Sequence, residues 1–414
     1  MSMTLDIDPL DLVDPARYQR DGCPHGVWTR LRAEAPVAYF DPPGYPPFWA
    51  ITKHSDLIQV ASQPLVFSSA KGITLDNNAE EVTEAMARFE MIVFLDPPRH
   101  GPVRQLANRE FLRSRVRARF DDVGRIAAQI VNDGATGGDM AECDFVTRFA
   151  GRLPLEVIAW VLGVPNADWQ RLLRDTDTVI GQDDPEFRLP GETAEQAGRR
   201  AQIDMHQYFT QMIEDRRRNP QQDLVSLLVQ STIDGVPLTH EQLVGYCELL
   251  VEAGNETTRD AIAGAMHAFC QHPDQWDKLR DHPELLSDAV EEILRWVTPI
   301  NYFVRTATED YELRDQTIHA GDKVVLFWAS GNRDEEVFDD PFKFRIDRRP
   351  NQHLVFGFGP HLCMGAHLAR AELEHMFSLL PSRMTWFEQS GPLERLHSSI
   401  NGAIKHLPIR YRLV

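Results

Sequence analysis

A single long helix constrains this fold more than any other feature of the sequence. Thr239, followed three residues later by Gln242, forms a capping box, which is a typical helix start. Pro273 predicts that the helix ends near Cys270. At 1.5 Å per residue, this span of about 31 residues is about 46 Å long. The other elements of the chain must therefore pack around this helix.

The centre of the helix combines apolar faces with a polar cluster. The segment CELLVEAGNETTRDAIAGAM is apolar over much of its circumference, as expected of a helix that crosses the interior. Burying a polar group without a partner costs roughly 2–7 kcal/mol, so polar residues at this depth indicate a function. The polar residues of the centre are Glu252, Asn255, Glu256, Thr257 and Thr258.

The rest of the chain predicts an α-rich α+β protein. Apolar spacing typical of helices runs from about Gly101 to Val297. Short strands are expected at Val37–Phe40 and Phe48–Thr52, around a Pro-Gly turn, and again in NYFVRTATEDYEL, QTIHAGDKVVLFWAS and IRYRLV. The length of 414 residues would suggest two or three domains of roughly 150 residues each, but we find no repeat or linker that marks a boundary.

Composition and charge exclude several classes of function. The net charge of −19 argues against a nucleic-acid partner and disfavours binding to an anionic membrane. The acidic N-terminal segment lacks the features of a secretory signal, and no window approaches the ~18 consecutive apolar residues of a membrane span. The five cysteines are scattered and odd in number, which indicates a reducing compartment. We therefore expect a cytoplasmic protein.

The segment Phe356-Gly357-Phe-Gly-Pro-His361-Leu-Cys363-Met-Gly365 carries the clearest chemistry. Its three glycines can adopt positive φ angles and approach a flat ligand closely. Cys363 lies just before a helix that is expected to begin near Gly365, whose N–H groups and dipole stabilise a thiolate. Such a thiolate can bind haem iron. A buried structural cysteine is one alternative, and zinc bound by His361 and Cys363 is another, which no further ligand cluster supports.

This segment resembles the haem-binding loop of the cytochrome P450 family, whose pattern is Phe-Gly-x-Gly-x-His-x-Cys-x-Gly, at all six fixed positions. The resemblance runs from about Pro36 to the C-terminus. It implies that residues 1–414 form a single triangular, α-rich haem domain with a long central helix and small β-sheets. It also implies haem b (iron protoporphyrin IX) held through Cys363, with Phe356, Gly357 and Gly365 against the cofactor.

The central helix supplies a second match, because AGNETT from Ala253 onward resembles the family's oxygen-binding motif, small-Gly-x-acid-Thr-Thr. The resemblance implies that Ala253 and Gly254 leave room for dioxygen and water against the backbone. Thr257 then hydrogen-bonds the oxygen, and Glu256 relays protons from solvent. The motif lies about 110 residues before Cys363.

Glu292 and Arg295 in VEEILRWVTP form a third match. Their i, i+3 spacing places both side chains on one helical face, where most such pairs are exposed and weak. In the family this pair is buried and braces the fold below the haem loop, with a third, basic partner from a downstream segment. Glu291 is the rival for the role of the acid. The candidates for the basic partner are Lys343, which stands where an arginine is common, Arg345, Arg348 and Arg349.

Four basic residues match the family's ligands of the haem propionates. His100 and Arg104 fit the His-x-x-x-Arg pair of an early helix, and Arg305 and His361 supply the remaining donors. Each of them alone could be an ordinary surface cation. Their order along the chain favours the binding role.

The resemblance implies a monooxygenase that inserts one oxygen atom of O2 into an apolar small molecule, such as a terpenoid, steroid, lipid or aromatic compound. AGNETTR and NYFVRTATEDYEL are most similar to soluble bacterial members that hydroxylate sterols, terpenoids or branched lipids. No flavin or iron–sulfur motif occurs, so a separate ferredoxin or flavodoxin-type protein is expected to supply electrons to a monomer. Four arginines follow one another at every second position: Arg113, Arg115, Arg117 and Arg119. They form either the docking face for this partner or a solvated basic patch.

Two other functions are open. The family includes peroxide-driven peroxygenases, but these typically lose the acid–alcohol pair, which this chain keeps in Glu256 and Thr257. A non-catalytic haem-binding sensor would not require that pair.

Glu252 departs from the family pattern, which usually has an apolar residue facing the substrate at this position. Positions 252 and 256 are one helical turn apart on the same side. We therefore expect Glu252 to point into the distal pocket. The alternative is a polar contact between Glu252 and an overlying helix.

Overall fold

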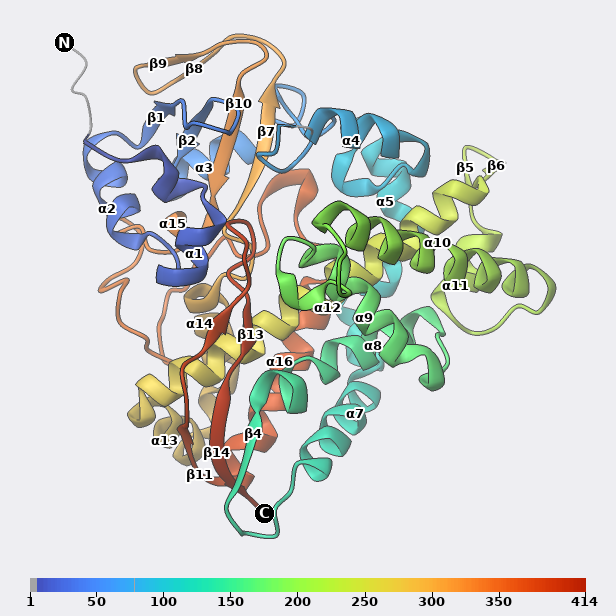
Figure 1. Cartoon of the computed structure of the whole chain (residues 1–414), viewed down its shortest axis with the longest axis vertical. Helices are drawn as coiled ribbons and strands as arrows, with labels where there is room; N and C mark the ends of the chain where they lie inside the picture. The colour runs from blue at the N-terminus through green and yellow to red at the C-terminus, as the bar shows by residue number, and fades with distance from the viewer. Residues whose placement is uncertain (1–5, 78) are drawn as a thin grey trace.

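The computed structural model describes residues 6–77 and 79–414, in which helices dominate and small sheets lie at their margins (Figure 1). The α-helices are α1 (Pro15–Asp21), α2 (His25–Glu34), α3 (His54–Ala61), α4 (Ala79–Met86), α5 (His100–Asn108), α6 (Arg113–Ala118), α7 (Phe120–Asp133), α8 (Arg152–Leu162), α9 (Trp169–Ile180), α10 (Ala194–Arg218), α11 (Leu224–Gln230), α12 (His240–Gln271), α13 (Pro273–Asp281), α14 (Leu286–Val297), α15 (Trp328–Gly331) and α16 (Ala366–Arg383). The strands are β1 (Val37–Phe40), β2 (Phe48–Ile51), β3 (Phe67–Ser68), β4 (Ala141–Asp144), β5 (Thr232–Ile233), β6 (Val236–Pro237), β7 (Tyr302–Ala307), β8 (Tyr311–Leu313), β9 (Gln316–Ile318), β10 (Lys323–Phe327), β11 (Met384–Gln389), β12 (Glu394–Arg395), β13 (Ile404–His406) and β14 (Pro408–Leu413).

The central helix α12 confirms the prediction from the capping box. The N–H of Gln242 donates to Thr239 Oγ1 over 3.2 Å, and the N–H of Thr239 donates to Gln242 Oε1 over 2.8 Å. The helix ends at Gln271, two residues before Pro273. The helices α8, α9, α10, α14 and α16 pack around it, so most of its length is buried (Figure 1). The sequence thus predicted both the existence and the limits of this element.

The largest sheet places one candidate site residue, Arg305. Its strand order is β1-β2-β10-β7-β3. The predicted pair β1 and β2 runs antiparallel, with Phe40 opposite Phe48, and β10 joins β2 in parallel. On the other side of β10, β7 runs antiparallel with Arg305 opposite Val324.

The sequence prediction found only one strand, β14 in IRYRLV, of a second sheet. Its strand order is β11-β14-β4, and β4 lies inside the region from Gly101 to Val297 that was expected to be helical. Cys143 of β4 pairs with Ile409 of β14, which is distant in sequence. The expectation of helix was wrong here because four residues carry little periodicity, and the strand exists through pairing with the C-terminal segment.

The outline of the molecule agrees with the triangular shape that was expected. In Figure 1 it narrows from the end that carries α2 and α4 toward the tip of β4 and the C-terminus. Within the described ranges, none of the helices combines the length and apolar character that crossing a bilayer would need.

Candidate functional site

The loop that carries Cys363 is closed by backbone hydrogen bonds and by glycines. The N–H of Cys363 donates to the carbonyl of Phe356 over 2.8 Å. Gly357 and Gly359 have φ angles of 70° and 72°. A Cβ on Gly359 would lie 2.4 Å from the carbonyl oxygen of Ala61, so this position requires glycine for its conformation and for space.

Cys363 lies immediately before the N-terminus of α16, where Gly365 is the N-cap. Burial raises the pKa of the Cys363 thiol, while the N–H groups of Gly365 and Ala366 and the guanidinium groups of Arg104 and Arg370 lower it. The side chain nevertheless keeps accessible surface. A thiol whose anion is supported by two N–H groups and two cations, and which is still reachable, is suited to bind a metal centre.

Four basic side chains converge beside this loop: His100 and Arg104 from α5, Arg305 from β7 and His361 from η9 (Gly359–His361). The ring centroids of His100 and His361 are 4.4 Å apart. Burial lowers the pKa of His361 to about 3, together with the charges of Arg305, His100 and Arg104. Burial also lowers the pKa of Arg305 to about 10. The structure therefore brings together the four residues that the sequence predicted as propionate ligands.

These basic groups have few partners within residues 6–77 and 79–414. Arg305 Nη1 donates to the carbonyl of Val304 over 2.8 Å, and Nε2 of His100 is buried without a hydrogen-bond partner there. Burial lowers the pKa of Arg104, which the nearby Cys363 partly offsets. Arg104 and Arg305 form no ion pair with the described residues, although the charge of Asp96 acts on Arg305. Such desolvated cations are unfavourable, so this cluster fits a ligand that brings negative groups of its own.

The oxygen-motif residues of α12 form an accessible strip on a helix that is otherwise largely buried. Leu249, Ala253 and Thr257, spaced four residues apart, all keep accessible surface and share one face. Gly254 packs against α8 instead, because a Cβ there would lie 3.0 Å from Cγ1 of Ile158. Thr257 Oγ1 donates to the carbonyl of Ala253 over 3.0 Å, which leaves the oxygen free to accept a hydrogen bond.

Glu256 is buried beside Thr257 and is held by an ion-pair network. Nη2 of Arg259 donates to Glu256 Oε2, and Nη1 donates to Asp177 Oδ1 of α9 over 2.6 Å. Burial raises the pKa of Glu256, although Arg259 opposes this. Oε1 of Glu256 has no hydrogen-bond partner among the described residues. The side chain of Asp177 is 18% exposed, so the network reaches from Glu256 toward solvent.

The sequence analysis missed the two partners of Glu256. Arg259 stands three residues after Glu256 in NETTR, and this i, i+3 spacing was a signal for an ion pair. Asp177 offered no such signal, because it reaches the network only through the packing of α9 on α12.

Glu252 is half-buried and forms no hydrogen bond or ion pair with the described residues. Burial raises its pKa to about 7. The contact with an overlying helix is made instead by Glu248, whose Oε1 lies 3.7 Å from Nδ1 of His206 on α10. Burial and the charge of Glu252 raise the pKa of Glu248 to about 8. The alternative that Glu252 itself contacts an overlying helix is therefore wrong.

The acid Glu292 of α14 is completely buried and organises the segment before the Cys363 loop. It accepts two hydrogen bonds of 2.8 Å from Arg295, and Arg348 Nε donates to it over 2.9 Å. The rival Glu291 faces another way, with Oε1 2.6 Å from Nε of Arg370. The structure thus selects Glu292 and Arg348, and the ammonium group of Lys343 pairs with Asp340 instead.

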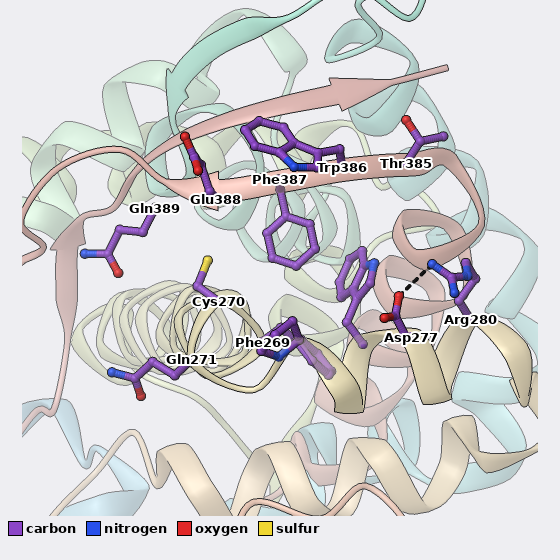
Figure 2. Close-up of a pocket in the computed structure, with 12 residues that line it drawn as sticks. Phe269, Cys270, Gln271, Asp277, Arg280, Thr385, Trp386, Phe387, Glu388 and Gln389 are labelled. Atoms are coloured by element: carbon purple, nitrogen blue, oxygen red, sulfur yellow. Dashed lines mark hydrogen bonds and ion pairs between the residues drawn. The ribbon is translucent and has the colours of Figure 1, made fainter.

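A surface cleft of about 490 Å³ lies away from these residues, between the end of α12, α13 and β11 (Figure 2). Phe269, Cys270 and Phe387 line its inner wall, and Asp277 pairs with Arg280 at its rim. Cys270 is about 20 Å along the helix axis from Thr257. None of the predicted site residues lines this cleft.

Comparisons with known proteins show which family this chain resembles in sequence. The family model described as cytochrome P450 matches residues 185–411. The chain is 37% identical over 395 residues to the methyl-branched lipid omega-hydroxylase of Mycobacterium tuberculosis, covering 93% of this chain and 90% of the relative. It is 36% identical over 409 residues to linalool 8-monooxygenase of Pseudomonas putida, covering 96% and 98%.

Solved structures are similar over nearly the whole chain. The cytochrome P450 CYP268A2 of Mycobacterium marinum, in complex with pseudoionone, superposes with a TM-score of 0.88 at 33% identity, covering 99% of this chain and 100% of that one. CYP108D1 of Novosphingobium aromaticivorans gives a TM-score of 0.87 at 30% identity, with 98% of each chain covered.

Proposed function

Because this chain belongs to the cytochrome P450 family, we propose that it binds haem through Cys363 and hydroxylates an apolar terpenoid, steroid or branched lipid. As a cytochrome P450 it is a haem-dependent monooxygenase. The activities for which its relatives are named support the substrate class, since these relatives include a methyl-branched lipid omega-hydroxylase, linalool 8-monooxygenase and steroid C26-monooxygenase. The observation that carries the proposal is the convergence of an accessible cysteine and four basic side chains at one loop.

The residues present fit haem on both of its polar features. Cys363 offers a thiolate for the iron, and the N–H groups of Gly365 and Ala366 support its charge. His100, Arg104, Arg305 and His361 are buried or half-buried bases that fit the two propionates. Phe356, Gly357 and Gly365 shape the loop on the thiolate side. When bound, haem supplies the iron at which dioxygen is reduced.

Glu256 and Thr257 of α12 are the residues that can hold and transfer protons. Ala253 presents no bulky side chain on the accessible strip, so dioxygen and water can approach the backbone of α12 there, while Gly254 lets α8 pack closely on the helix. Thr257 Oγ1 can accept a hydrogen bond there, since its own proton is donated to the carbonyl of Ala253 within the helix. Glu256, with one free oxygen and a raised pKa, can hold a proton and pass it on.

Electrons come from a ferredoxin or flavodoxin-type partner that docks beside the Cys363 loop. Of the four arginines of the basic run, Arg115 and Arg119 pair with Glu110. Arg113 and Arg117 are exposed and have no ion-pair partner in the part of the chain that the structure describes. Their helix, α6, packs against α16, which begins just after Cys363. We therefore centre the proposed docking face on Arg113 and Arg117, the two arginines of the run that are free to pair with a partner.

The docking proposal is tested by kinetics with a ferredoxin donor. The double variant Arg113→Glu with Arg117→Glu should have a KM for an acidic ferredoxin about tenfold higher at low salt, because the two positive charges of the wild-type protein steer the partner. Turnover with peroxide alone should not change. Arg217→Glu, an exposed arginine on α10, is the matched control. An unchanged KM for ferredoxin in the double variant would contradict this docking face.

The function itself is tested by comparing two ways of driving turnover. We expect the purified protein to hydroxylate a terpenoid, steroid or branched lipid with O2, NADH and a ferredoxin system. Turnover with peroxide alone should be much slower, because the acid–alcohol pair is retained. Faster turnover with peroxide would make the protein a peroxygenase.

We further propose that the whole chain is one haem domain that acts as a cytoplasmic monomer.

A further inference from the structure

Two carboxyl groups of α12 lie one helical turn apart at the edge of the accessible strip. Glu252 directly precedes Ala253, and Glu248 lies one turn closer to the start of the helix. Leu249 and Ala253, which keep accessible surface, flank Glu252 on the same stretch. Glu252 therefore borders the strip that also carries Thr257.

The surroundings of this pair disfavour a charged partner. Glu248 is only 6% exposed, and its nearest basic group is His206, 3.7 Å away. Burial lowers the pKa of His206, together with the nearby His240 and Arg88, so its ring is mainly neutral at neutral pH. Burial raises the pKa of both carboxyl groups, so the neutral or singly charged pair is favoured. Such a pair suits a neutral hydrogen-bond donor better than a cation.

We propose that Glu252 determines substrate specificity by accepting a hydrogen bond from a hydroxyl group at the far end of an otherwise apolar substrate. The inference rests on the proposed function, because it places the substrate against the strip of α12. Glu252 is about 7.5 Å along the helix axis from Thr257. A substrate whose hydroxyl binds at Glu252 therefore presents a remote carbon, several bonds away, to the oxidising centre.

Glu248 supports Glu252 in this role. Glu248 lies one turn away, and burial together with the charge of Glu252 raises its pKa, so Glu248 takes up a proton more readily than Glu252 and leaves Glu252 as the better acceptor. Glu248 lies 3.7 Å from His206 on the side of α10, whereas Glu252 borders the strip and makes no hydrogen bond or ion pair with the described residues. The substrate class that fits is an amphiphilic alcohol with a long or branched apolar body.

The test uses ligands that differ only in the donor. Tetrahydrogeraniol, its methyl ether and the parent hydrocarbon share one branched skeleton, and only the first carries an O–H. Each is titrated by its spin-state absorbance shift into the haem-loaded wild-type protein and into the variants Glu252→Leu and Glu252→Gln. Glu241→Leu, in the first turn of the same helix, is the matched control.

We expect the wild-type protein to bind the alcohol about tenfold more tightly than the ether, as one hydrogen bond in a buried site allows. The Kd values of Glu252→Leu for the three ligands should lie within about twofold of one another. Its Kd for the hydrocarbon should be lower than that of the wild-type protein. Glu252→Gln should keep part of the preference, because its amide oxygen still accepts. The control should show the same preference as the wild-type protein. Turnover of the alcohol by the wild-type protein should place the new hydroxyl at the end of the skeleton opposite to the existing one.

The proposal would be overturned by an equal affinity of the wild-type protein for alcohol and ether, or by an unchanged preference in Glu252→Leu. Loss of the preference in Glu241→Leu as well would assign it to the helix as a whole and would also overturn it. The carbon monoxide spectrum of the reduced wild-type protein separates this failure from that of the proposed function. A thiolate-type spectrum with no preference for the alcohol would contradict only the role of Glu252. A spectrum without thiolate character would contradict the proposed haem site.

Discussion

Arg348 donates from Nε to Oε2 of Glu292 over 2.9 Å, and both side chains are almost completely buried. Arg348 also donates to the carbonyls of Lys343 and Asp340, and the N–H of Arg345 donates to Glu292 over 2.9 Å. The backbone from Asp340 to Arg348 is thus held against α14, just before the chain reaches Phe356. This network holds the segment that leads toward the Cys363 loop against α14.

We expect Glu292→Gln to destabilise the protein by about 3–5 kcal/mol, because two buried guanidinium groups lose their shared counter-charge. The adjacent Glu291→Gln is the control, since its carboxylate is 28% exposed and pairs with Arg370 and His353 rather than with Arg295 and Arg348, so its loss should be smaller. Urea unfolding of the two variants measures the free energy of unfolding. Equal losses would contradict the bracing role of Glu292.

Cys363→Ser should remove the thiolate-type absorbance band of the reduced protein with carbon monoxide, together with most of the activity. A hydroxyl does not ionise as the Cys363 thiol can beside Arg104, Arg370 and the N–H groups of α16. Cys270→Ser is the matched control, because its thiol lies in the remote cleft and its pKa is raised to about 12 by burial. If Cys363→Ser keeps both the band and the activity, another residue holds the iron.

Thr257→Ala should still consume NADH, with a larger share of the electrons released as hydrogen peroxide. The hydroxyl of Thr257 is then no longer available to hydrogen-bond dioxygen beside Ala253. The ratio of product formed to NADH consumed should fall several-fold, while the rate of NADH consumption stays within about threefold. Thr258→Ser, whose side chain is buried, serves as the control. Unchanged coupling in Thr257→Ala would remove Thr257 from the mechanism.

Glu256→Gln should slow turnover by about 10²–10⁴, the range for loss of a positioned proton donor. The amide keeps the shape of the side chain and its contact with Arg259, but it cannot carry a proton. A larger solvent deuterium isotope effect on the slowed turnover would identify proton delivery as the affected step. A rate equal to that of the wild type would mean that protons arrive by another route.

The pH dependence of stability should contain a contribution from His406. Its Nδ1 lies 2.8 Å from Asp144 and its Nε2 lies 2.7 Å from Glu186, which follows α9. These carboxylates raise the pKa of His406 although burial opposes them. A raised folded-state pKa stabilises the protein fully below the unfolded value of about 6.5, and the stabilisation is lost as pH rises through the folded value.

The wild-type protein should therefore exceed His406→Gln in free energy of unfolding by about 1 kcal/mol at pH 5.5, and by less above neutral pH. His319→Gln, whose ring pairs with Asp310 in an exposed position, is the control for a surface histidine. A difference between wild type and His406→Gln that does not vary with pH would show that His406 stabilises the fold without its charge.

Local patterns predicted the elements that carry the chemistry. The capping box at Thr239 and the stop at Pro273 predicted α12 to within one residue at each end. The strands β1 and β2 and the helix after Cys363 also formed where they were expected. The comparisons confirm the family that the Cys363 loop and the AGNETT motif indicated. These features depend on residues within a few turns of one another, so their spacing in the sequence is enough to reveal them.

Long-range contacts decided the rest. The choice of Arg348 over Lys343, the strand β4, and the ion pair between Arg259 and Asp177 all join segments that are far apart in the sequence. The sequence by itself determined which side chains line one face of α12, because the helical period fixes that. Only the tertiary structure decided that Glu248 lies near His206 of α10 while Glu252 makes no hydrogen bond or ion pair with the described residues. The packing of the other helices sets which side chains of that face are paired or desolvated.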